Sequence, residues 1–188
     1  MAKKCRDCDV LNKNPLMPRC YDCSIDYMKT DEFKAKKDKL RLAAEKREAK
    51  RQRKKLRERK EGLMGLSEWK KKIQTEFNKY IRLRDKDLPC ISCQRHHQGQ
   101  YHAGHYRSVG ACPELRYDET NCYKQCAPCN NHLSGNLIEY RIGLIKRRGQ
   151  AAVDWLEGDH EPLNLTIPEA KELLAHWRFK VKEIKTDR

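Results

Sequence analysis

Hydrophobic residues recur at intervals of three and four residues between positions 67 and 89. They are Trp69, Ile73, Phe77, Tyr80 and Ile81. This spacing predicts a helix with one apolar face, which we expect to pack on the rest of the fold. Ser67 is the expected N-cap, with Glu68 in the first turn, and Asp87 and Pro89 are expected to end the helix.

A second helical face lies near the carboxyl end of the chain. Its members are Leu173, Leu174, Trp177, Val181 and Ile184. Thr166 and Glu169 form a capping-box signal before this face, and a short helix over residues 151–156 is expected to precede it. These apolar side chains are most simply core or dimer residues. The alternative is that Trp155 and Trp177 stack on unpaired bases.

Residues 29–61 show no such face and are dominated by charge. They include sixteen Lys or Arg residues and seven Asp or Glu residues, a net charge of +9, and no Gly or Pro. Strong helix formers fill the stretch, which predicts a long, solvated helix that Gly62 and Gly65 end. Contact with DNA phosphates, pairing with a partner helix and a plain charged spacer all agree with this pattern.

Between these stretches the pattern predicts two strands and a helix. Residues 100–108 and 115–117 are the expected strands, joined by a loop. A helical run is expected from Cys129 to Ile145, with Gly149 as its stop.

The composition shows that the 188 residues do not fill one core. Hydrophobic residues make up 38% of the chain, charged residues 37%, and the mean hydropathy is −1.02. Part of the chain must therefore be extended, solvated or braced by metal. The net charge of +15 predicts a polyanionic partner, and we favour nucleic acid over an acidic membrane surface. No apolar run reaches the roughly 18 residues of a membrane span.

Eight of the ten cysteines form four Cys-x-x-Cys pairs. The pairs are Cys5 with Cys8, Cys20 with Cys23, Cys90 with Cys93, and Cys126 with Cys129. Two pairs supply four thiolates to one tetrahedral ion, so two structural zinc ions per chain are expected. Disulfides are the alternative, but no apolar secretory run follows Met1, which favours a reducing cytosol. Cys112 and Cys122 are expected to be buried apolar side chains, although Cys122 is near enough to the last pair to substitute as a ligand.

These patterns predict an α+β fold in four segments. Residues 1–28 are expected to form a zinc ribbon or knuckle, residues 29–66 the basic helix and linker, residues 67–150 a zinc-braced strand, strand, helix core, and residues 151–188 a helical extension. Turns in the knuckle are expected at Asn12, Asn14, Pro15 and Pro18. The knuckle either contacts DNA or orients the helix that follows it.

The core resembles the HNH, or ββα-metal, nucleases. A His ending the first strand, an Asn before a Cys-x-x-Cys pair and a polar ligand after it match His105, Asn121, and Asn130 or His132. The whole chain, through residues 104–108, residues 129–136 and the amino-terminal cysteine pairs, is similar to the NinG family of lambdoid phage recombination proteins. That resemblance implies a structure-selective endonuclease that cuts Holliday junctions and D-loops in the cytoplasm of the bacterial host.

The HNH resemblance implies roles for individual residues. His105 is the general base that takes a proton from the attacking water, Arg107 joins it at the catalytic site, and Asn121 orients the His105 ring or the hairpin backbone. A catalytic magnesium or manganese ion is expected at His102, Asn130 and His132. The phosphate-binding candidates are Arg107, Arg116, Lys124, Arg141, Arg147 and Arg148.

Gly104 departs from the HNH pattern, which often has an Asp or His ligand directly before the base. His102 is the nearest substitute, but residues three apart in a strand point to opposite faces unless a bulge intervenes, which Gly104 would permit. Each assigned residue also has a structural alternative: a packed His105, a helix-capping Asn130, or a His132 that caps the helix or contacts phosphate.

Branched DNA and a second copy of the chain are the expected partners. Symmetric cleavage of a four-way junction needs two active sites, which predicts a twofold dimer. Two other functions are kept open: a non-catalytic zinc protein that binds or anneals DNA, and a sequence-specific HNH nuclease that cuts linear duplex equally well.

Overall fold

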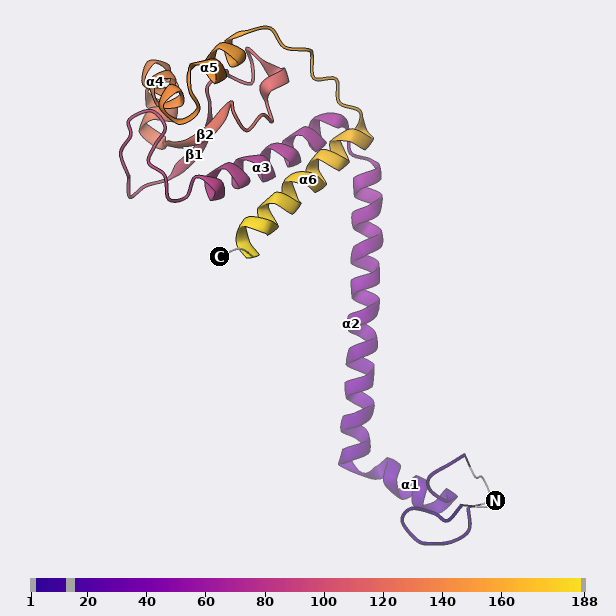
Figure 1. Cartoon of the computed structure of the whole chain (residues 1–188). Helices are drawn as coiled ribbons and strands as arrows, with labels where there is room; N and C mark the ends of the chain where they lie inside the picture. Colours follow the sequence, from indigo (N-terminus) through magenta and orange to yellow (C-terminus); the bar gives the residue numbers. More distant parts are fainter. Residues whose placement is uncertain (1–2, 13–15, 187–188) are drawn as a thin grey trace. The chain divides into compact units, whose positions relative to one another are not determined.

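The computed structural model describes residues 3–12 and 16–186 of the chain. The turn expected at Asn14 and Pro15 lies outside these residues. The described part is mixed α+β, mostly helical, with a two-stranded sheet (Figure 1). It divides into two compact units, Met1–Leu63 and Met64–Arg188, and each is described by itself. Within the described ranges, no helix combines the length and the apolar character that crossing a membrane requires.

In the first unit, a cysteine-rich loop leads into helix α1 (Tyr21–Lys29) and helix α2 (Asp31–Gly62). Thr30 separates the helices, and its side-chain oxygen accepts a hydrogen bond from the Phe33 N–H at 3.2 Å, which caps α2. The rings of Tyr27 and Phe33 pack edge to face across this junction, with centroids 5.4 Å apart.

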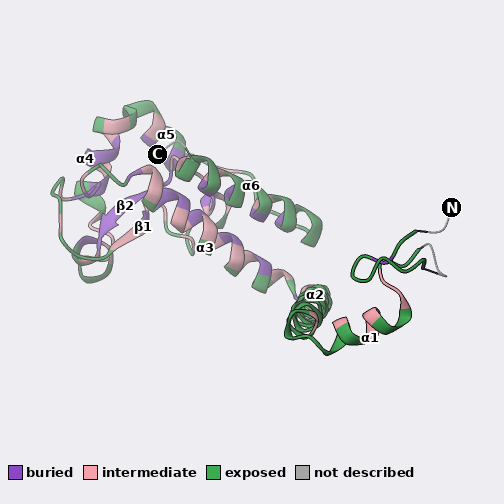
Figure 2. Cartoon of the chain, turned by 90° about the horizontal axis from the view of Figure 1, so that it is seen from below, coloured by how far each residue is buried: buried purple, intermediate pink, exposed green. Residues whose placement is uncertain are grey.

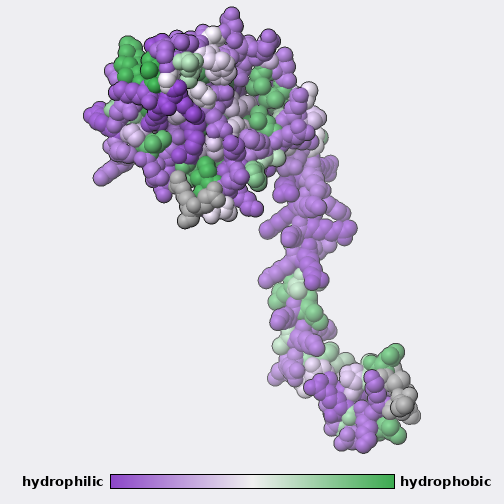
Figure 3. Space-filling view, viewed as in Figure 1, coloured by the Kyte–Doolittle hydropathy of each residue, from purple (hydrophilic) through white to green (hydrophobic). Residues whose placement is uncertain are grey.

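Helix α2 confirms the long solvated helix expected from the charge pattern. None of its 32 residues, all of them described, is buried. Intrahelical ion pairs three or four residues apart support it, as between Lys54 and Glu58 at 3.7 Å. Figure 3 shows that hydrophilic side chains cover most of the visible face of α2.

The second unit is built on two packed helices, α3 (Leu66–Arg84) and α6 (Ile167–Thr186). The five apolar residues predicted on α3 are all buried, as is Trp177 on α6. The rings of Phe77 and Trp177 meet edge to face with centroids 4.8 Å apart. The predicted faces are therefore confirmed as core, and Figure 2 shows their burial along both helices.

The cap predicted for α6 is confirmed, and the cap predicted for α3 is wrong. Glu169 accepts a hydrogen bond from the Thr166 N–H at 2.8 Å, which confirms the capping box of α6. Ser67, however, is not the N-cap of α3, because the helix already begins at Leu66. The Glu68 carboxylate accepts a hydrogen bond from the Gly65 N–H at 3.1 Å, which moves the cap to Gly65.

The sheet consists of β1 (Tyr101–His105) and β2 (Cys122–Cys126), paired antiparallel with His105 opposite Cys122. The second strand was expected at residues 115–117, which is wrong. Pro113 lacks an N–H and starts a 3-10 turn over Pro113–Leu115, so this segment turns instead of pairing. All five residues of β2 are buried, because both faces of the hairpin are covered.

The helix after β2 begins later than expected. A single π-helical turn spans Pro128–His132, and α4 starts only at Leu137 and ends at Arg148. Ser134, Gly135 and Asn136 adopt positive φ values of 47°, 89° and 44°, which interrupt the helix. Gly149, with φ of 83°, confirms the predicted stop and precedes α5 (Gln150–Glu157).

The hairpin lies between two apolar clusters. Cys122 and Ala103 pack with residues of α3 and α6, whereas Tyr123 packs with Tyr140 of α4. The Tyr140 hydroxyl donates a hydrogen bond to the Gly104 carbonyl at 2.8 Å. The hairpin is thereby fixed from both sides, with β2 buried throughout and β1 partly exposed.

Candidate functional site

Four cysteines clamp the open end of the hairpin. Cys90 and Cys93 lie before β1, Cys126 ends β2, and Cys129 lies in the π turn. Their sulfur atoms all lie within 4.8 Å of one another, and Cys93 Sγ is 3.9 Å from Cys126 Sγ. Thiolates at about 2.3 Å from a tetrahedral zinc are about 3.8 Å apart, so this cluster fits zinc.

Hydrogen bonds from neighbouring groups stabilise part of the thiolate charge of this cluster, whereas burial raises the pKa of Cys126 and of Cys129. The Cys126 N–H donates to Cys90 Sγ at 3.4 Å, and the Asn136 side-chain amide donates to Cys129 Sγ at 3.7 Å. Burial raises the pKa of Cys93, but hydrogen bonding, first of all with His97 at 3.1 Å, lowers it to about 6. Such outer hydrogen bonds orient metal ligands and stabilise their charge.

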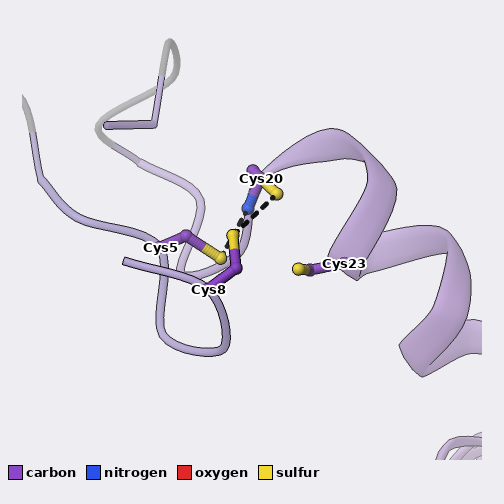
Figure 4. A group of neighbouring side chains, drawn as sticks. All are labelled: Cys5, Cys8, Cys20 and Cys23. Atoms are coloured by element: carbon purple, nitrogen blue, oxygen red, sulfur yellow. Dashed lines mark hydrogen bonds between the residues drawn. The ribbon is translucent and has the colours of Figure 1, made fainter. Parts of the chain in front are cut away.

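The first unit contains the other predicted cluster, Cys5, Cys8, Cys20 and Cys23 (Figure 4). Cys5 and Cys8 come from the loop, and Cys20 and Cys23 from the start of α1, where Cys20 is the N-cap. Cys8 Sγ lies 3.6 Å from Cys20 Sγ. Hydrogen bonds from the N–H groups of Asp7 and Cys20 lower the pKa of Cys5 to about 6. This cluster also fits zinc.

All ten cysteines are described, and none forms a disulfide. Cys112 and Cys122 are buried outside both clusters, as expected for small apolar side chains. The alternative in which Cys122 replaces a zinc ligand is therefore wrong, because its side chain faces the core with α3.

His105 ends β1, and its ring is half-buried against Phe77, with centroids 6.0 Å apart. Its Nε2 lies 3.0 Å from the backbone carbonyl oxygen of Arg116. A carbonyl only accepts hydrogen bonds, so Nε2 carries the proton and the neutral ring has its lone pair on Nδ1. Burial lowers the pKa of His105 from its ordinary value of 6.5, which favours this neutral form.

Asn121 is fully buried and clamps the loop between the strands. Its Oδ1 accepts the Arg107 N–H at 2.7 Å, and its Nδ2 donates to the carbonyls of Arg107 at 3.0 Å and Leu115 at 3.1 Å. Of the two roles expected for it, the side chain serves the hairpin backbone. Leu115 directly precedes Arg116, so the clamp also places the carbonyl that His105 uses.

Gly104 is required by Gln125, a residue for which the sequence predicted no role. A Cβ at position 104 would lie 2.2 Å from Gln125 Oε1. Gln125 is fully buried, and its amide donates to Ser92 Oγ at 2.7 Å and the Gly135 carbonyl at 2.5 Å. No local sequence pattern marked Gln125, because its burial depends on the coverage of this strand on both faces by helices distant in sequence.

The bulge considered at Gly104 is absent from the hairpin, which is described throughout. The register runs without interruption from Tyr101 opposite Cys126 to His105 opposite Cys122. His102 therefore points to the opposite face from His105. Its Nε2 is buried and has no hydrogen-bond partner among the described residues.

The other residues assigned to the catalytic ion lie in the π turn before α4. Asn130 is half-buried and donates to Asn131 at 2.8 Å, and His132 is exposed. Asn136, not Asn130, is the N-cap of α4. In the described ranges, the groups of three or more clustered His, Cys, Asp or Glu ligands are the two cysteine clusters. The assignment of a catalytic ion here stays a prediction.

The six basic residues proposed to bind phosphate all contact other groups of the chain. Their side chains donate hydrogen bonds as follows: Arg107 to Cys112 Sγ, Arg116 to Gln74, Arg141 to Glu157, Arg147 to the Pro89 carbonyl, Arg148 to the Tyr123 hydroxyl, and Lys124 to the Lys86 carbonyl. Lys124 is also buried, with 4% of its surface exposed, so binding a phosphate would require it to leave this position. The phosphate contacts stay predictions.

Comparison with known proteins identifies the family of the chain. The family model for the Bacteriophage Lambda NinG protein matches residues 1–187. The chain belongs to the NinG family. Both cysteine clusters, the hairpin and α2 lie within the residues matched to NinG.

Similar NinG proteins come from several phages. Protein ninG of Salmonella phage P22 is 48% identical over 134 residues, which cover 71% of this chain and 66% of the relative. The ninG proteins of Escherichia phage lambda and Escherichia phage 933W are 47% and 46% identical over 134 residues, covering 71% of this chain and 66% and 67% of those proteins. The matched segment thus spans about two thirds of these relatives. No solved structure matches the chain.

Proposed function

We propose that this NinG family member is a metal-dependent endonuclease that cleaves branched DNA during phage recombination. The observation that carries the proposal is the state of His105. Its Nε2–H donates to the Arg116 carbonyl, so a neutral imidazole presents the Nδ1 lone pair as a proton acceptor. An HNH-like site requires such a base at the end of the first strand of a hairpin that a helix follows.

The surrounding residues hold this base in place. Asn121 fixes the loop between the strands through three hydrogen bonds, and the Tyr140 hydroxyl holds the Gly104 carbonyl beside His105. Zinc at Cys90, Cys93, Cys126 and Cys129 would brace the other end of the hairpin. Rigid support of this kind keeps a catalytic group at its working position.

A divalent ion, magnesium or manganese, completes the proposal. When bound, such an ion stabilises the negative charge on the departing oxygen of a phosphodiester. Among the described residues, neither His102 nor His132 belongs to a group of three or more clustered His, Cys, Asp or Glu side chains. His105 takes the proton of the attacking water at Nδ1.

Substrate and partners belong to the same proposal. Resemblance to the NinG recombination proteins supports branched DNA in the host cytoplasm as the target, and the net charge of +15 supports a polyanionic partner. Two-sided cleavage of a four-way junction would use a twofold dimer.

The test compares cleavage of a synthetic four-way junction and of linear duplex of the same sequence, in magnesium and in manganese. His105→Ala should lower junction cleavage by about 10²-fold or more, the usual contribution of a general base. His96→Ala is the matched control, because His96 is exposed in the turn before β1, and it should leave cleavage unchanged. Unchanged cleavage by His105→Ala would disprove the assigned base.

A second candidate is a zinc protein that binds or anneals branched DNA without cutting it. The lack of a third His, Cys, Asp or Glu ligand cluster among the described residues favours this alternative. It predicts that the unaltered chain binds the junction but does not cleave it with either ion. Equal cleavage of junction and linear duplex would instead indicate a nuclease without preference for branches.

A further inference from the structure

Helix α2 carries a row of basic residues that the site around His105 does not use. We call this row the basic stripe; its members are Lys39, Lys46, Lys50, Arg53, Arg57 and Lys60. Successive members are separated by seven, four, three, four and three residues. At about 100° and 1.5 Å per residue, they occupy an arc of about 80° and a length of about 31 Å.

The acidic residues in the middle of α2 lie elsewhere around the helix. Asp38, Glu45 and Glu48 are about 80° or more from the centre of the basic stripe. Arg41 pairs with Asp38 at 3.5 Å and with Glu45 at 3.9 Å, which neutralises charge away from the stripe. In the described part of the chain, Arg57 is the stripe member that forms an ion pair, to Glu61 at 4.0 Å.

The basic stripe is exposed along its length. α2 has no buried residue, every member of the basic stripe is exposed, and Figure 2 draws α2, seen end-on, mainly in the colour of exposed residues. Like charges three and four residues apart on a helix repel one another, so these residues disfavour the free helix. A polyanion along the stripe would remove that repulsion.

The composition of the stripe favours phosphates over a protein partner. Between Lys46 and Lys60, every residue within the arc is Lys or Arg. Protein interfaces need an apolar core, which this part of the arc does not provide. Duplex DNA carries one phosphate per strand for about every 3.4 Å of its axis, so a row about 31 Å long matches many phosphates.

We propose that the basic stripe of α2 binds the phosphate backbone of duplex DNA. It is a contact surface on the first unit, separate from the candidate site on the second. The proposal does not depend on whether His105 cleaves DNA.

The test measures binding of the full chain to a short linear duplex, without magnesium or manganese, over a range of salt concentrations. The stripe variant combines Lys46→Gln, Lys50→Gln and Arg53→Gln. Its matched control combines Lys37→Gln, Lys55→Gln and Arg59→Gln, which removes the same charge from the opposite face of α2. The stripe variant should bind at least about tenfold more weakly, with a salt slope smaller by about 2.7, and the control should change the slope by less than about 1.

Three results would overturn the proposal. Equal losses in both variants would mean that overall charge, and not the stripe, binds DNA. Unchanged binding by the stripe variant would exclude the stripe. A change in the sedimentation of the free protein without a change in DNA binding would make the stripe a protein contact.

Separate control measurements distinguish the effect of the stripe on DNA binding from effects on folding and on catalysis. Neutralising the stripe removes repulsion, so the variant should keep its helical circular dichroism and its two zinc ions. His105→Ala should retain the full salt slope. Failure of the nuclease proposal would therefore leave the stripe result standing, and loss of stripe binding would leave the His105 test intact.

Discussion

The Nε2 atom of His105 donates a hydrogen bond to the carbonyl oxygen of Arg116, 3.0 Å away. The Arg116 side chain is held in turn by α3, because its Nε donates to Gln74 Oε1 at 2.7 Å. The proton on the imidazole is thus assigned by a backbone group whose position depends on both the hairpin loop and α3. The protonation state of His105 should therefore respond to any change in the position of the Arg116 carbonyl.

The pH dependence of cleavage should show a basic group that works below its ordinary range. Burial lowers the pKa of His105 from 6.5, so the neutral base should persist as the pH falls below 6.5. The acid limb of the cleavage rate is expected below pH 6.5. Between the folded-state pKa and 6.5 the unfolded chain binds a proton that the native chain does not, so the free energy of unfolding should fall as the pH falls through this range.

The measurement is a rate profile on a synthetic junction, with zinc content followed in parallel because acid also releases zinc. His105→Ala should abolish the limb in any residual activity. A limb centred above pH 6.5, with zinc retained, would contradict the effect of burial on this ring.

Replacing Asn121 should destabilise the second unit strongly. Asn121→Ala leaves the Arg107 N–H and the carbonyls of Arg107 and Leu115 without their partner in a partly buried loop. We expect a loss of about 2–4 kcal/mol in the free energy of unfolding. All three tryptophans lie in the second unit, so their fluorescence in urea reports its unfolding.

Asn131→Ala is the control for this measurement, because Asn131 is exposed, and it should change the free energy of unfolding by less than about 0.5 kcal/mol. A similarly small effect of Asn121→Ala would show that the loop is held by other contacts.

The helices could be predicted from the sequence because their signals are local. Trp69 to Ile81 repeat at helical spacing, the charges of α2 leave it no face to bury, and Thr166 with Glu169 marks the start of α6. The cysteine clusters could also be predicted, since four Cys-x-x-Cys pairs can be recognised in the sequence without any knowledge of packing.

The hairpin was only half predictable because its partners are distant in sequence. β2 lacks the alternation of polar and apolar residues, since α3 covers one of its faces and α4 the other. The same coverage explains why Lys124 and Gln125 are buried, which no local pattern indicated. The start of α4 was missed because three successive residues, Ser134 to Asn136, adopt positive φ.

We predict that each cysteine cluster binds one zinc ion and that single substitutions separate the two sites. Cys126→Ser and Cys8→Ser should each lower the zinc content from two ions per chain to one, because each removes one of four thiolates. Only Cys126→Ser should lower the urea midpoint of tryptophan fluorescence, since Cys8 lies in the other unit. Metal analysis of the purified chains gives the zinc count.

Cys122→Ala is the control, because Cys122 is buried but belongs to neither cluster, and it should keep both ions. Retention of two zinc ions by Cys126→Ser would mean that the cluster at the hairpin is not a four-thiolate site.

Gly104→Ala should cost stability through Gln125. The added Cβ would lie 2.2 Å from Gln125 Oε1 and 3.0 Å from its Cβ, so the Gln125 side chain must move. It can do so only by weakening its hydrogen bonds to Ser92 and the Gly135 carbonyl, and we expect a loss of about 1–3 kcal/mol. Gly110→Ala, where a Cβ meets nothing within 4 Å, is the control and should cost less than about 0.5 kcal/mol. Because Gln125→Ala removes the clashing amide, Gly104→Ala should cost less in that background, and strictly additive losses in urea unfolding would show that Gln125 is not the reason for glycine beside His105.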